Sequence, residues 1–100
     1  MQKPGGVLLM MFEVLPEWED AFNRWYDETH LPEMLAQSGI RSAHRYVAAS
    51  ADAKYLTIYE LDHPGVLNSE AFIAWRDASE STREMQKHLT FKSRVVYRGL

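Results

Sequence analysis

Cysteine is absent from this chain of 100 residues, which excludes disulfides, thiol catalysis and zinc sites built on thiolates. Long apolar runs are missing as well. The run near the start, Val7 to Phe12, ends at Glu13 and is too short for the core of a signal peptide or for a membrane span. We therefore expect a cytoplasmic protein with no membrane partner.

A strong charge of either sign is also lacking. Eleven Lys and Arg residues against 14 Asp and Glu give a formal net charge of −3, and the basic residues are scattered, so we expect no nucleic-acid partner. The sequence contains no glycine-rich phosphate loop, nucleophile elbow or dinucleotide fingerprint. Their absence disfavours redox chemistry that depends on a cofactor, and we expect no cofactor.

Apolar and aromatic residues, by contrast, are plentiful. Hydrophobic residues make up 46% of the chain, charged residues 25% and aromatic residues 12%. These proportions are typical of a folded globular protein, and the length suits a single domain over residues 1–100. The aromatic side chains must either fill the core or face a ligand.

Four segments have the composition of β-strands: 7–14, 40–47, 54–61 and 91–98. The first is apolar at almost every position, which predicts burial on both of its faces. The last alternates between two faces, one with Phe91, Ser93, Val95 and Tyr97 and the other with Lys92, Arg94, Val96 and Arg98.

Helices are expected between these strands. The first should end near residues 29–30, because Pro32 disfavours helical angles at the residue before it, and a short helical piece over 34–36 should follow. Another helix is expected to begin near residues 68–69. The capping box at residues 81–84 predicts the start of a further one.

The resulting order of strand, helix, strand, strand, helix, strand predicts an α+β protein with the ferredoxin-like βαββαβ fold. In that fold the helices cover one face of an antiparallel sheet. The other face would expose the apolar side of segment 7–14 to water, in a patch larger than monomers tolerate. We therefore expect a homodimer in which two sheets face each other as a dimeric α/β barrel.

A longer stretch of sequence resembles a known family. Residues 23–33 (NRWYDETHLPE) and 39–46 (GIRSAHRY) are similar to the EthD-like family of dimeric α/β barrel proteins, in which a WYD…HLPE stretch is followed by a glycine and an RY pair. The resemblance is best over residues 7–61, where 55–61 is similar to the family's third strand. It implies a ferredoxin-like subunit, a homodimer and a small apolar cavity beside the sheet. Activities in the wider superfamily include cofactor-free decarboxylation, dehydration, cyclisation and isomerisation, cofactor-independent oxygenation, and haem chemistry, and the fold does not choose among them.

Tyr26, Asp27 and His30 are the strongest candidates for catalysis. On a helix His30 lies one turn beyond the other two, so Asp27 could orient an imidazole that acts as a general acid or base. The helix end and Asp27 favour protonated His30 and burial opposes it, a competition that would hold the pKa of His30 near working pH. The same residues also suit a structural histidine at a helix end, and both interpretations stay open.

A second set of residues is expected to bind the substrate: Trp25, Arg45, His44, Tyr46 and Tyr59. His44 and Arg45 fall on opposite faces of one strand, so only one of them can face a given cavity.

Asp27, His30 and Glu33 are spaced like metal ligands, but Pro32 interrupts the helix that would align them, and we expect no metal site.

Other residues leave alternatives open. Arg94 and Arg98 share a strand face, so they could bind a substrate carboxylate or pair with Glu13 or Glu60 across strands. His88 suits a haem ligand by residue type alone.

Three functions are compatible with these patterns. The leading one is a small cofactor-independent lyase or isomerase (dehydration, decarboxylation, cyclisation or isomerisation) acting on an apolar, aromatic or polyketide-like molecule. In it His30 would move the proton, Asp27 would orient His30, and Tyr26 or Arg45 would bind a carbonyl or its enolate. The second is a non-catalytic small-ligand-binding or accessory protein of a degradation or biosynthesis pathway. The third is a haem-binding or cofactor-free monooxygenase-like barrel.

Overall fold

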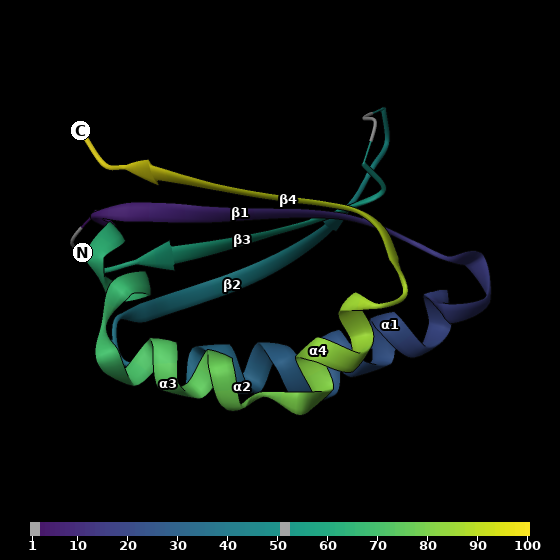
Figure 1. Cartoon of the computed structure of the whole chain (residues 1–100). Helices are drawn as coiled ribbons and strands as arrows, with labels where there is room; N and C mark the ends of the chain where they lie inside the picture. The colour runs from purple at the N-terminus through teal and green to yellow at the C-terminus, as the bar shows by residue number, and fades with distance from the viewer. Residues whose placement is uncertain (1–2, 51–52) are drawn as a thin grey trace.

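The computed structural model describes residues 3–50 and 53–100 as a sheet packed on a layer of helices (Figure 1). Along the chain the elements are β1 (Gly6–Val14), η1 (Pro16–Trp18), α1 (Glu19–Trp25), η2 (Tyr26–His30), α2 (Leu31–Leu35), β2 (Ile40–Val47), β3 (Tyr55–Leu61), η3 (Pro64–Asn68), α3 (Glu70–Ala78), α4 (Glu80–Gln86) and β4 (Leu89–Arg98). Residues 1, 2, 51 and 52 of the expected domain lie outside the described residues. Within the described part of the chain, no helix has the length and apolarity needed to cross a membrane.

The strands form one antiparallel sheet in the order β2-β3-β1-β4. The helices all lie on one face of this sheet, and the described residues leave the other face uncovered (Figure 1). This arrangement is the α+β ferredoxin-like βαββαβ fold and confirms the prediction. All four predicted strands are present. The strand at 40–47 has the predicted bounds, and the ends of the others differ from the prediction by at most two residues.

The register of the sheet decides which side chains face the helices. Leu8 in β1 lies opposite Tyr59 in β3 and Val96 in β4, and Leu8 and Tyr59 are buried in the core beneath the sheet. Their neighbours in β1, Val7 and Leu9, point to the uncovered face and are only half-buried. The first strand is therefore apolar on both faces, and one of those faces has no cover among the described residues.

The first helical segment runs from Pro16 to Leu35 without a break, so the expected end just before Pro32 is wrong. Its middle turn, η2, is a π-helix in which the Leu31 N–H donates to the Tyr26 carbonyl. Pro32 has no N–H to donate, and in a regular α-helix its ring would collide with the carbonyl four residues earlier. The wider π turn accommodates it, so the helical piece expected over 34–36 becomes the end of this same segment.

The helices of the second crossover begin at two serines. Ser69 is the N-cap of α3, as predicted, and its hydroxyl accepts a hydrogen bond from the Phe72 N–H at 3.2 Å. The capping box expected at residues 81–84 is wrong, because α4 begins earlier with Ser79 as its N-cap. Ser81 lies inside α4, where its Oγ accepts a hydrogen bond from the Trp25 indole and so joins α4 to α1.

Candidate functional site

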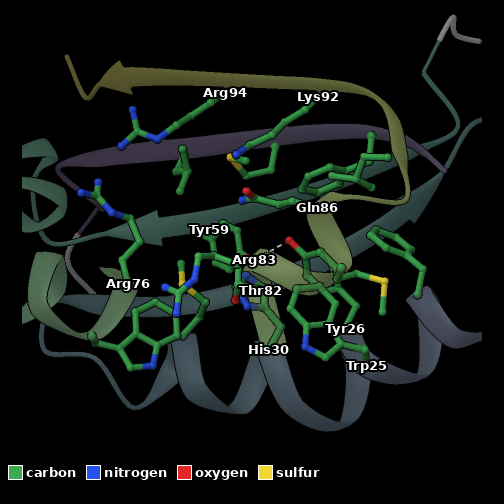
Figure 2. Close-up of a pocket in the computed structure, with 18 of the residues that line it drawn as sticks. Trp25, Tyr26, His30, Tyr59, Arg76, Thr82, Arg83, Gln86, Lys92 and Arg94 are labelled. Atoms are coloured by element: carbon green, nitrogen blue, oxygen red, sulfur yellow. Dashed lines mark hydrogen bonds between the residues drawn. The ribbon is translucent and has the colours of Figure 1, made fainter. Parts of the chain in front are cut away.

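A cavity of about 430 Å³ lies between the sheet and the helices (Figure 2). Most of its wall is apolar: Leu8, Met10, Phe12, Phe22, Trp25, Met34, Phe72, Trp75, Met85 and Leu89. Its size and its apolar wall are typical of a pocket for a small organic molecule. The EthD-like resemblance implied a cavity of this kind beside the sheet.

His30 places an imidazole in the wall of this cavity, at the end of η2. Its ring stacks on Trp25 and Trp75, with centroid distances of 4.6 and 6.0 Å, and meets the edge of Tyr26 at 4.9 Å. Its Nδ1 is buried and has no hydrogen-bond partner. A buried polar atom without a partner is uncommon, because structural side chains normally satisfy such atoms.

Burial lowers the pKa of His30 to about 4, because the apolar surroundings disfavour the charged form. The expectation of a pKa near working pH is therefore wrong. It relied on Asp27 to support the cation, and no hydrogen bond joins Asp27 to His30. At neutral pH the imidazole is uncharged and able to accept a proton.

Asp27 pairs instead with Arg45 at the flank of the site. The Arg45 Nη1 donates to the Asp27 Oδ1 at 3.0 Å, and Nη2 donates to the Asn23 Oδ1 at 2.7 Å. The guanidinium carbon lies 4.6 Å from the centre of the Tyr26 ring. Neither Asp27 nor Arg45 lines the cavity. They affect it indirectly, because Arg45 packs on the ring of Tyr26, which does line it.

Tyr26 and Tyr59 do line the cavity, and their hydroxyl oxygens lie 2.6 Å apart in a hydrogen bond (Figure 2). Both side chains are almost completely buried, and desolvation raises the pKa of each hydroxyl. Both therefore stay protonated at neutral pH. Among the five expected binding residues, Tyr59 and Trp25 are the ones that line this cavity.

The structure places two expected binding residues on the other side of the sheet. Arg45 in β2 turns toward the helices, so its neighbours His44 and Tyr46 turn toward the uncovered face, where they lie opposite Ile58 and Leu56. His44 and Tyr46 are exposed and do not line the cavity. Sequence alone left open which face of this strand points inward, and the register answers it.

Several cavity residues from the second half of the chain were not predicted as site residues. Trp75 and Arg76 come from α3, Arg83 comes from α4 and Lys92 comes from β4. Trp75 had a signal, because it forms an apolar stripe with Phe72 at helical spacing, but such a stripe indicates a core equally well. The basic residues had none, since charges on a helix or on an outer strand usually face water.

His88 lies outside the cavity, with its ring stacked on Trp18 at a centroid distance of 3.5 Å. Within residues 3–50 and 53–100, no cluster of three or more His, Cys, Asp or Glu residues could hold a metal ion.

The fold and the cavity together define a class: ferredoxin-like α+β proteins with a largely apolar cavity between sheet and helices. Solved structures with this fold include a monooxygenase from the gene ActVA-Orf6 of Streptomyces coelicolor, in complex with the ligand nanaomycin D. It matches with a TM-score of 0.74 and 14% identity, over 97% of this chain and 88% of that chain.

Two further solved structures are similar over most of their length. A dimeric ferredoxin-like protein from an uncultured marine organism has a TM-score of 0.73 and 12% identity, over 98% of this chain and 90% of its own. An EthD family protein from Bacillus halodurans C-125 has a TM-score of 0.68 and 14% identity, over 95% of this chain and 98% of its own. At these identities the similarity shows the fold alone, which includes EthD family members, as the sequence resemblance indicated. No family model matches the chain, and no curated protein matches it in sequence.

Proposed function

We propose that this protein is a cofactor-independent oxygenase that oxidises an aromatic small molecule held in the cavity. The observation that carries the proposal is the environment of His30: a neutral imidazole without a hydrogen bond at Nδ1, beside the Tyr26–Tyr59 hydroxyl pair, in an aromatic wall. These groups supply a proton acceptor and a proton donor, and the Nδ1 atom and both tyrosine side chains are buried.

In the first step His30 removes a proton from a CH₂ group of the substrate that is acidified by adjoining aromatic rings and a conjugated carbonyl. The low pKa of His30 in the free protein does not prevent this transfer. The imidazolium and the new carbanion attract each other strongly in surroundings of low dielectric constant, and this attraction offsets the desolvation of the cation.

The tyrosine pair stabilises the anion. Tyr26 and Tyr59 share one hydrogen bond, which leaves the second hydroxyl proton available for a substrate oxygen. Because burial keeps both hydroxyls protonated, one can donate to the carbonyl oxygen as negative charge develops there.

Molecular oxygen then takes the electrons of the carbanion and forms a C–O bond. His30 returns its proton to the outer oxygen, which gives a hydroperoxide. Loss of the remaining hydrogen of that carbon as a proton breaks the O–O bond, leaves a carbonyl and releases water. The balance is one CH₂ and one O₂ giving one C=O and one H₂O, so no external reductant is needed.

The lyase or isomerase that leads the sequence-based hypotheses would use the same proton transfer without oxygen. We favour oxygenation because a monooxygenase is among the structural neighbours, with a fold that matches over most of both chains. We also propose that the protein works as a homodimer, supported by the uncovered apolar face of its sheet and by a structural neighbour described as dimeric.

The proposal is tested by oxygen consumption with anthrone, whose CH₂ group lies between two aromatic rings. We expect uptake of O₂ with formation of anthraquinone, and a loss of at least about 100-fold in His30→Gln, which removes the proton acceptor. His88→Gln is the matched control, because it changes the same residue type outside the cavity and away from the uncovered sheet face, and its rate should be unchanged. The oxygenase proposal is wrong if His30→Gln retains the wild-type rate or if anthrone binds without any oxygen uptake. Binding without oxygen uptake would favour a non-catalytic binding protein.

A further inference from the structure

Positive charge is concentrated in the wall of the cavity. Four of the chain's 11 Lys and Arg side chains line it, namely Arg76, Arg83, Lys92 and Arg94, but only one of its 14 Asp and Glu side chains, Asp77. The chain as a whole has a net charge of −3, so a general excess of basic residues does not explain this distribution.

Two of these cations already have partners. Arg76 donates to the Asp77 carboxylate at 3.2 Å, and Arg83 donates to the Asp77 backbone carbonyl. Lys92 and Arg94 form no hydrogen bond or ion pair with any residue in the ranges 3–50 and 53–100. They lie on the same face of one strand, and a bound anion would relieve the repulsion between them.

The carboxylates that sequence left open as partners of Arg94 are on the wrong face of the sheet. Glu13 lies opposite Phe91 and Glu60 lies opposite Val7, so both belong to the uncovered face. The structure therefore excludes pairing of Arg94 with Glu13 or Glu60. Of the partners that the sequence left open, a ligand carboxylate remains.

Protection of a sheet edge is the ordinary reason for charges on a strand such as β4, which is the outer strand of this sheet. That reason suffices for Arg98, which does not line the cavity. Edge protection does not explain why Lys92 and Arg94 line the cavity. There they lie opposite Phe12 and Met10, two residues of the cavity wall.

The two unpartnered cations thus form a basic end of the cavity at β4, and the aromatic rings of the first helical segment face it. Figure 2 shows Lys92 and Arg94 reaching in from β4, while Trp25 and His30 lie across the cavity on the first helical segment. A ligand that satisfies both ends combines a flat apolar body with an acidic group. A carboxylate suits the basic end, because a guanidinium can bind it through two parallel hydrogen bonds.

We propose that the protein binds an aromatic carboxylic acid, with its carboxylate at Arg94 and Lys92 and its ring system against Trp25 and Trp75, close to His30. The proposal narrows the substrate class of the oxygenation described above and rests on it for the reaction. The anion site itself can be tested by binding alone.

The test uses two ligands of nearly equal shape, 2-naphthoate and its uncharged analogue 2-acetonaphthone, titrated by calorimetry near neutral pH and at low salt. We expect 2-naphthoate to bind about tenfold more tightly, and added salt to weaken 2-naphthoate alone. Equal affinities for the two ligands, or no measurable binding of 2-naphthoate, would overturn the proposal.

Variants locate the site. Arg94→Gln and Lys92→Gln should each weaken 2-naphthoate about fivefold and leave 2-acetonaphthone unchanged. Arg98→Gln, from the same face of the same strand but outside the cavity, should change neither ligand. If Arg94→Gln retains the full preference for 2-naphthoate, or if Arg98→Gln removes it, the anion does not bind where we place it.

The anion site and the oxygenase activity can be contradicted independently of each other. His30→Gln should keep the preference for 2-naphthoate, since the histidine does not contact the carboxylate. A charge preference without any oxygen uptake from anthrone supports the anion site and contradicts the oxygenase. Oxygen uptake that depends on His30, in a protein with no charge preference, supports the oxygenase and contradicts the anion site.

Discussion

At the scale of single residues, His30 links the chemistry of the site to the stability of the fold. Its pKa is about 4 in the folded protein against an ordinary value of 6.5, because burial disfavours the cation. Between these two pH values the unfolded chain binds a proton at this position that the folded protein does not bind. Stability is therefore lost as the pH falls through this window, by up to about 3 kcal/mol over its whole width.

His30→Gln should remove this dependence. We predict that the free energy of unfolding of the wild type falls more steeply than that of the variant between pH 6.5 and about 4, measured by urea denaturation at a series of pH values. Carboxylates titrate alike in both proteins, so the difference between the two curves isolates the histidine. Parallel curves would mean that His30 is solvated in the folded protein.

The residue scale also shows how far sequence reasoning reaches. Tyr26 and His30 were found as candidates because one helical turn separates them, and local spacing is visible in a sequence. The partner of Asp27 was not visible, because Arg45 comes from a strand and meets Asp27 only after the sheet docks on the helices. The pKa of His30 was not predictable for the same reason, because the burial of His30 depends on Trp75 from the opposite half of the chain.

At the scale of elements, the segment that carries His30 is a continuous helix with one wider π turn in its middle. Local propensity predicted a break before Pro32, and a break would have freed His30 from the helix. The π turn instead keeps the segment continuous and fixes His30 on the side that faces Trp25. Proline signals in a sequence indicate a disturbance of the helix, but tertiary packing decides whether the disturbance is an end or a bulge.

The N-cap of α3 offers a test at this scale. Ser69→Ala should lower the free energy of unfolding by about 1 kcal/mol, because the Phe72 N–H loses the hydroxyl that satisfies it. Asn68→Ala, at the exposed position just before the cap, is the control and should stay within about 0.5 kcal/mol of the wild type in chemical denaturation. Equal effects of the two substitutions would show that Ser69 does not cap the helix. Because α3 carries Trp75 and Arg76, its loosening should also weaken ligand binding in the cavity.

At the scale of the whole molecule, the sheet separates two different surfaces. The alternation of side chains along the strands could be read from the sequence, so the fold and the two faces of β4 were predictable. The cavity was not predictable, because its wall is assembled from strands and helices that are far apart in the chain. Its basic end depends on the pairing of β4 with β1, which brings together residues from the two ends of the chain.

The uncovered face is the feature that supports the proposed dimer. Leu9 lies at its centre, opposite Ile58 on one side and Val95 on the other, and all three are only half-buried. Phe91 and Tyr97 extend the apolar surface along β4 and are 47% and 59% exposed. A contiguous apolar sheet face of this kind is rare on a monomer and is typical of an obligate interface between two copies.

We predict a mass twice that of the 11.6 kDa chain in light scattering at micromolar concentration. Leu9→Lys should yield a single-chain mass or a protein that aggregates, because the dimer would bury an unpaired charge while a monomer would leave it in water. Leu35→Lys is the matched control: Leu35 is 44% exposed on α2, on the helical side of the molecule, and its replacement should leave the mass unchanged. A wild type that stays at the mass of one chain, or a Leu9→Lys protein that remains a dimer of normal stability, would show that the sheet face is not where two copies meet.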